Sequence, residues 1–257
     1  MAGNKSDYIT SLTMKYLYRL YQLLIAAPLM IIITIITALV TILGCLLGDG
    51  HFWGFYPARL WSKLTCHLFL LPVEVIGREN IDKDTSYVFV ANHQGAFDIF
   101  LVFGFLNHQF RWMMKKSLEK IPFVGTACKT AKHIFVDQSS PKAIRETLGD
   151  AGKILQGGTS VVVFPEGTRT RTGKMGRFRK GGFLLADHLR LPVVPVTLDG
   201  PFQVLPRTRG VWFVHWHPLR MTIHKPILPT EQGKNDIDLL ARTSYDIIHD
   251  SLPDYMK

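Results

Sequence analysis

The chain has 257 residues, which suffices for one α/β domain with a full core plus an appendage and is too short for a second catalytic domain. It carries 30 Lys and Arg against 20 Asp and Glu, and 47% of its residues are hydrophobic. Residues 111–180 hold 15 basic and 5 acidic residues, so the excess positive charge is local. Such a field suits anionic lipid, a phosphate-bearing substrate or nucleic acid. The three cysteines follow no ligand pattern and indicate reduced thiols.

The N-terminal part of the chain has the pattern of a membrane segment. No charged residue occurs from Leu23 to Gly48, and this run exceeds the roughly 20 residues that cross a hydrocarbon core. The aromatic-rich segment 51–71 follows it and resembles an interfacial amphipathic helix. Residues 1–72 are therefore predicted to form a membrane-embedded helical hairpin. Basic residues are nearly equal on the two sides of the run, so spanning the bilayer and dipping into one leaflet both stay open.

After Pro72, short β-branched runs alternate with helical patterns, which predicts an α/β domain over residues 73–257. A helix is expected from Ser140 to about Gly157, and a last helix is expected to open at Asn235 or Asp236. Most strand candidates are apolar throughout, so the sheet is predicted to be mixed, mostly apolar and flanked by helices. Strands are expected at 87–91, 133–136, 160–164, 193–198, 211–215 and 220–224.

The turn after the first of these strands holds Asn92, His93 and Asp98. The carboxyl end of a strand is where α/β folds place reactive groups. A spacing of five does not suit one helix face, so His93 is assigned to the turn and Asp98 to the first helical turn, where its carboxylate can hold a ring proton. The other ring nitrogen can then take a proton from an alcohol. The alternative is a buried histidine beside an aspartate that only caps the helix.

A second strand leads into residues 164–169, with the sequence FPEGTR. Glu166 lies just after the carboxyl end of the strand, and the planar guanidinium of Arg169 suits phosphate oxygens. The alternative is a solvated basic loop with an ordinary turn glutamate. The chain has no GxSxG serine motif, which favours direct attack by a substrate hydroxyl. His215 and His217 lack further ligands nearby, so no metal site is predicted.

In these motifs the chain resembles the glycerolipid acyltransferase family, and within it the lysophosphatidic acid acyltransferases that make phosphatidic acid. The likeness extends from about Val73 to Gly200 in four ordered blocks. Residues 92–98 match NHxxxxD, and the other blocks are 115–137, 164–169 with 178–181, and 193–196. Gln138 stands where the family usually has arginine, and Gly95 where it often has serine. The acceptor headgroup therefore stays open.

The resemblance implies a role for each matched residue. His93 is the implied general base and Asp98 its partner, and Arg169 is implied to bind the acceptor phosphate. Backbone N–H groups near Gly95 or Gly167 are candidates for oxyanion donors. The other implied substrate-binding residues are Glu166, Gly167, Thr168, Arg179 and Lys180, with Asn92 and Pro195 as motif support.

The implied reaction is transfer of a fatty acyl group to the free sn-2 hydroxyl of lysophosphatidic acid without a cofactor. Its donor is an acyl thioester carried by coenzyme A or an acyl carrier protein, and its further partners are the lysophospholipid and the bilayer. No nucleic acid partner is expected. A thioester donor indicates the cytoplasmic face of a membrane, and the bacterial inner membrane is favoured over the endoplasmic reticulum. Two alternatives are an acyltransferase for another lyso-lipid headgroup and a non-catalytic protein that binds anionic lipids.

Overall fold

The centre of the protein is one mixed β-sheet. The computed structural model describes residues 5–136, 149, 151, 155, 159–209, 213–230 and 235–257. Within these residues seven strands pair side by side, and all neighbours are parallel except β6 and β7. In spatial order the strands are β1 (Val73–Ile76), β7 (Leu219–Ile223), β6 (Val193–Asp199), β2 (Val88–Ala91), β5 (Ser160–Val163), β3 (Phe110–Lys115) and β4 (Ile134–Val136).

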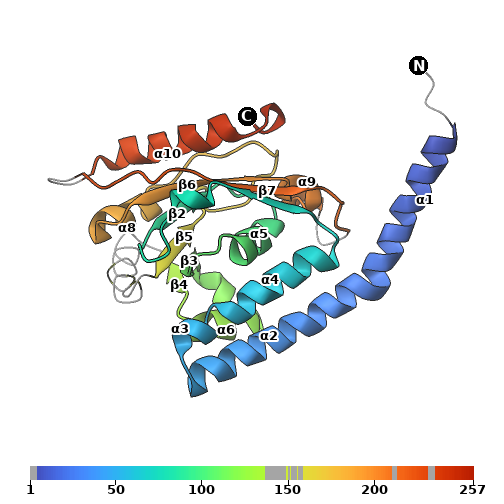
Figure 1. Cartoon of the computed structure of the whole chain (residues 1–257), viewed down its shortest axis with the longest axis horizontal. Helices are drawn as coiled ribbons and strands as arrows, with labels where there is room; N and C mark the ends of the chain where they lie inside the picture. The colour runs from blue at the N-terminus through green and yellow to red at the C-terminus, as the bar shows by residue number, and fades with distance from the viewer. Residues whose placement is uncertain are drawn as a thin grey trace.

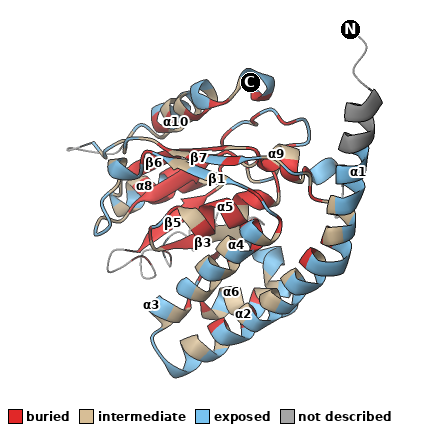
Figure 2. Ribbon diagram, turned by 45° about the vertical axis from the view of Figure 1, so that its right-hand side comes forward, coloured by how far each residue is buried: buried red, intermediate tan, exposed pale blue. Residues whose placement is uncertain are grey.

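Helices cover both faces of the sheet (Figure 1). Side chains alternate across a strand, so Phe89 and Ala91 of β2 pack toward α4 (Tyr56–Leu68) and α5 (Phe97–Phe105). Val88 and Val90 face the other way, toward α8 (Gly181–Leu189) and α10 (Ile237–Ser251). Figure 2 shows the sheet buried between these layers. The other described elements after β1 are α6 (Val124–Thr130), α9 (Pro201–Val204), η2 (Arg78–Asn80), η3 (Lys116–Lys120), η4 (Arg207–Arg209) and η5 (Asp254–Met256).

The N-terminal segment forms a helical hairpin against the domain. Helix α1 (Lys5–Tyr21), the π-helical turn η1 (Gln22–Ala26) and α2 (Ala27–Leu47) run on without a break, and after the short α3 (Gly50–Trp53) the chain returns as α4. The indole N–H of Trp61 in α4 donates to the Thr34 hydroxyl in α2 at 2.9 Å. The stretch Leu12–Leu47 is long and apolar enough to cross a membrane, by length and composition, and most of it is exposed.

Five of the six expected strands are confirmed to within two residues at their ends. The strand expected at 211–215 is wrong where the structure describes it, because Phe213 to His215 carry no strand; residues 211 and 212 lie outside the described residues. Strands β1 and β3 were not expected. Asp236 caps α10, as predicted, by accepting hydrogen bonds from the N–H groups of Asp238 and Leu239. Most of the helix expected between Ser140 and Gly157 lies outside the described residues.

A buried glutamine joins the hairpin to the domain. Gln22, in the π-helical turn, is 3% exposed. Its amide nitrogen donates to the Val214 carbonyl at 2.8 Å, and its amide oxygen accepts from the Val214 N–H at 2.9 Å. The side chain thus satisfies both backbone groups of Val214, which lies in the described residues 213–218 where no strand is formed.

Gln22→Ala is expected to destabilise the protein by about 2–4 kcal/mol, because two buried backbone groups lose their partner. For a chain of this size the melting temperature should fall by roughly 5–10 °C. Thermal unfolding of the detergent-solubilised protein measures this. Leu23→Ala, at the neighbouring exposed position, is the control. Equal melting temperatures for the two variants would show that the glutamine link carries no stability.

Candidate active site

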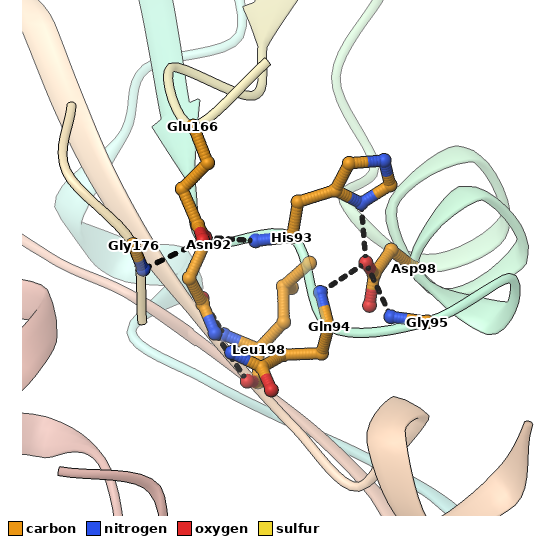
Figure 3. A network of polar contacts seen from close by, with 8 residues as sticks. All are labelled: Asn92, His93, Gln94, Gly95, Asp98, Glu166, Gly176 and Leu198. Atoms are coloured by element: carbon orange, nitrogen blue, oxygen red, sulfur yellow. Dashed lines mark hydrogen bonds and ion pairs between the residues drawn. The ribbon is translucent and has the colours of Figure 1, made fainter. Parts of the chain in front are cut away.

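The candidate site begins where β2 ends. Asn92 follows the last residue of the strand and is fully buried. Its amide nitrogen donates to the Leu198 carbonyl at 2.9 Å, and its amide oxygen accepts from the Leu198 N–H at 2.8 Å (Figure 3). The side chain therefore extends the pairing of β2 with β6 by one residue and fixes where the following loop starts.

His93 and Asp98 meet as the sequence predicts. The His93 Nδ1 and the Asp98 Oδ2 lie 2.6 Å apart, and the same oxygen accepts from the N–H groups of Gln94 at 2.7 Å and Gly95 at 3.0 Å. Asp98 is fully buried on the first turn of α5, where the helix dipole favours a negative charge. Because the Asp98 Oδ2 already accepts two backbone N–H groups, Nδ1 is the donor toward it, and in the neutral imidazole Nε2 then offers a lone pair. In Figure 3 this second nitrogen points away from Asp98.

An aromatic stack fixes the plane of the imidazole. The rings of His93 and Phe164 are stacked with centroids 4.0 Å apart and an angle of 8° between their planes. Phe164 also stacks with Trp112, at 5.4 Å and 21°. The His93 side chain keeps 17% of its surface exposed. The ring is therefore held by an aspartate at one nitrogen and by a phenyl face, while part of its surface stays exposed.

The Glu166 carboxylate accepts hydrogen bonds from the backbone of two different chain segments. Its Oε1 accepts from the N–H of His93 and its Oε2 from the N–H of Gly176, each at 2.7 Å (Figure 3). Burial raises the pKa of Glu166 to about 7, the two backbone hydrogen bonds lower that pKa, and the charge of Asp98 raises it. Both carboxylate oxygens are thus engaged within the protein. Glu166 ties three chain segments together at the backbone of His93.

His93 lines a cavity of about 780 Å³, within the size range of small-molecule sites. One part of the lining is small or apolar and comes from the hairpin, α5 and α6. A second part is basic. The small or apolar residues include Thr34, Thr37, Ala38, Thr41, Ile99, Phe103, Val124 and Ala127, and the basic residues are Lys115, Arg169, Arg179 and Arg207.

Several predicted site residues meet at this cavity and others do not. Lys180 pairs through its Nζ with Asp238 of α10 at 2.6 Å, which gives it a partner outside the cavity lining. Pro195 lies in β6, paired with Val90 of β2. Gln138 lies outside the described residues. Besides His93, the predicted residues that line the cavity are Gly167, Thr168, Arg169 and Arg179.

Among the backbone groups near Gly95 and Gly167 that are candidate oxyanion donors, the N–H groups of these two glycines themselves are engaged within the protein. The Gly95 N–H donates to Asp98, and the Gly167 N–H donates to the Phe164 carbonyl at 2.9 Å. Gly95 has a steric role instead, because a Cβ there would lie 2.3 Å from the carbonyl oxygen of Pro201 in α9. The glycine thus allows α9 to approach the loop between His93 and Asp98.

Sequence reasoning missed the Phe164 ring and Arg207 as site residues. Phe164 belongs to the FPEGTR motif, but its contact with His93 joins positions 71 residues apart. Arg207 lies outside every motif, in η4 after α9, and no local pattern marks it. The apolar pattern of α2 predicts only a membrane segment, although Thr34, Thr37 and Ala38 of this helix also form a wall of the cavity.

Comparison with known proteins shows that this chain belongs to the acyltransferase family. A family profile described as Acyltransferase matches residues 72–199. The 1-acyl-sn-glycerol-3-phosphate acyltransferase of Saccharomyces cerevisiae is 30% identical over 215 residues, which cover 82% of this chain and 70% of that protein. A chloroplastic enzyme of the same name from Arabidopsis thaliana is 33% identical over 173 residues, covering 67% of this chain and 48% of the relative. The chain spans about half the length of such plant relatives.

A solved structure has the same fold. The crystal structure of the 1-acyl-sn-glycerophosphate (LPA) acyltransferase PlsC from Thermotoga maritima superposes with a TM-score of 0.74 at 26% identity. The match covers 91% of this chain and 93% of that one, so it extends beyond the sheet into the N-terminal segment.

Glu166→Gln is expected to remove part of the pH dependence of stability between pH 4.5 and about 7. In that window the unfolded carboxyl has lost its proton and the folded one still holds it, so the free energy of unfolding falls as pH rises. The drop due to this group should reach about 3 kcal/mol. Urea unfolding across the window measures it. Glu79→Gln, at an exposed position, should keep the wild-type slope, and an unchanged slope in Glu166→Gln would contradict the prediction.

Proposed function

Because this chain belongs to the acyltransferase family, we propose that it transfers a fatty acyl group from an acyl thioester to the sn-2 hydroxyl of lysophosphatidic acid, forming phosphatidic acid. The supporting observation is the cavity at His93, whose lining joins guanidinium groups to small apolar side chains. A lysophospholipid carries an anionic head and an apolar chain, and an acyl donor carries a second chain. The reaction matches the names of the yeast and Thermotoga maritima relatives.

In the proposed mechanism, Nε2 of His93 removes the proton of the acceptor hydroxyl. The hydroxyl oxygen attacks the thioester carbonyl carbon, a new C–O bond forms, and the C–S bond breaks. The leaving thiolate takes its proton from the imidazolium. Asp98 holds the Nδ1 proton throughout and stabilises the positive ring that forms midway, as in other histidine–carboxylate pairs. No covalent intermediate with the protein is involved.

Arg169 and Arg179 are the proposed ligands of the acceptor phosphate. Both line the cavity, and planar guanidinium groups bind phosphate oxygens in pairs. Gly167 adopts a left-handed conformation with φ at +72°, and a Cβ there would lie 3.1 Å from the guanidinium carbon of Arg179. Glycine at this position therefore allows Arg179 to lie across the loop. Thr168 lines the same part of the cavity. We assign Glu166 to holding the loop rather than to binding substrate.

We further propose that residues 1–72 attach the domain of residues 73–257 to a membrane. The exposed apolar face of α2 supports this, since such a surface is costly in water. The opposite side of α2 contributes Thr34, Ala38 and Thr41 to the cavity, so an acyl chain bound there would lie at the level of the bilayer. A coenzyme A or acyl carrier protein donor would approach from the cytoplasm.

His93→Ala is expected to lower the rate of phosphatidic acid formation from lysophosphatidic acid and labelled acyl-coenzyme A by about 10²–10⁴-fold, the usual contribution of a general base. Asp98→Asn should also lower it, because the ring loses its fixed tautomer. Turnover by the detergent-solubilised protein is measured beside His188→Ala, a control at an exposed position of α8. Full activity in His93→Ala would contradict the assignment of His93 as the base, and absence of turnover in the wild type would favour a non-catalytic lipid-binding protein.

Ala38→Phe is expected to shift the preference toward shorter acyl chains, because Ala38 is buried on α2 and lines the cavity. A mismatch of one methylene in an apolar pocket changes kcat/KM by about 10-fold or more. Competition between acyl-coenzyme A donors of different length reads out the shift. Leu39→Phe, one residue further on the exposed face, should keep the wild-type preference; a like effect in both variants would argue against an acyl site along α2.

A further inference from the structure

Arg207 reaches the cavity from a part of the chain that carries no motif. It opens η4, the short turn after α9, and its side chain lines the cavity together with Arg169 and Arg179. Its Nη1 donates a hydrogen bond to the hydroxyl of Thr168 at 2.5 Å. This bond joins positions 39 residues apart and directs the guanidinium to the loop that holds Arg169.

The backbone just before Arg207 is tied to the loop between His93 and Asp98. Pro206 forms an isolated β-bridge with Gly95, and the N–H of Ala96 donates to the Leu205 carbonyl. Gly95 permits this approach because it has no side chain. The position of Arg207 is therefore set relative to the imidazole by a short connection, although the side chain itself is exposed.

The basic lining has no counter-charge within the described residues. Lys115, Arg169, Arg179 and Arg207 all line the cavity, and no carboxylate of the described part of the chain forms an ion pair with any of them. Glu166 lies nearby, but both of its oxygens are taken by backbone N–H groups. Like charges gathered around one space repel one another, and an anion bound among them relieves that repulsion.

We infer that Arg207 binds the phosphate of the acceptor headgroup and thereby makes the site select a phosphomonoester over a phosphodiester. This inference rests on the proposed function. A phosphomonoester offers three terminal oxygens and close to two negative charges at neutral pH, enough to engage three guanidinium groups. A phosphodiester offers two free oxygens and one charge, and its extra substituent replaces the oxygen that Arg207 would contact. Arg207 is thus a specificity-determining residue, distinct from the base and its partner.

Arg207→Gln tests this inference, with Arg207→Lys as a second variant that keeps the charge and loses the planar fork. KM for lysophosphatidic acid should rise about 10- to 100-fold in Arg207→Gln, as expected for a lost charged hydrogen bond, at nearly unchanged kcat. Lysophosphatidylglycerol, a phosphodiester, should be affected far less, so discrimination between the two acceptors falls by the same factor. Arg207→Lys should lie between wild type and Arg207→Gln. Arg242→Gln, at an exposed position of α10, is the matched control.

The outcomes separate this inference from the proposed function. An unchanged ratio of kcat/KM for the two acceptors in Arg207→Gln, with wild-type turnover intact, overturns the role of Arg207 and leaves acyl transfer standing. A fall in kcat with unchanged KM overturns it too. If the wild type turns over neither acceptor, the acyl transfer proposal fails, and the dissociation constants of the two lysolipids decide the matter. Equal selectivity of wild type and Arg207→Gln in that binding measurement overturns the inference.

Discussion

The geometry of the site depends on one buried carboxylate, that of Glu166. It accepts from the backbone of His93 on one side and of Gly176 on the other, so it joins the loop after β2, the loop after β5 and the segment leading to α8. Both partners of this carboxylate are backbone N–H groups, so the link does not depend on the rotamer of a second side chain. The cost is a carboxyl group held away from water, which raises its pKa to about 7.

Around this link the polar and apolar parts of the site are kept apart. Asp98 and the backbone amides of its loop occupy one side of the imidazole, and Phe164 covers a ring face. The Nε2 atom is the ring nitrogen that does not contact Asp98. Catalytic groups held in advance in this way need little reorganisation when substrate binds. The site therefore combines a firmly held imidazole, the proposed base, with a lining that changes from guanidinium groups to small apolar side chains.

The sequence predicted those features that follow from short-range order. The pairing of His93 with Asp98 follows from one strand, one short turn and one helix start, so spacing alone placed both side chains correctly. The role of Glu166 could not be read in this way, because only the tertiary fold shows that backbone amides occupy both of its oxygens. The sequence does not predict strand β3, because Arg111 and Lys115 interrupt its apolar pattern. Arg111 is nevertheless buried, at 4% exposed, and only the tertiary fold shows this. The contacts of Arg207 with Thr168 and of Phe164 with His93 join positions far apart in the sequence, so no local pattern predicts them.

The shared use of α2 has a consequence for how substrates would be found. One face of this helix is exposed and apolar, and the other forms a wall of the cavity. If the exposed face lies in a bilayer, the cavity lies beside the lipids, and a lysolipid would reach it from the membrane rather than from bulk water. The search then takes place in two dimensions, and the quantity that sets the rate is the mole fraction of lysolipid in the membrane. Dilution by other lipids would slow such an enzyme even when the total amount of substrate in the suspension is constant.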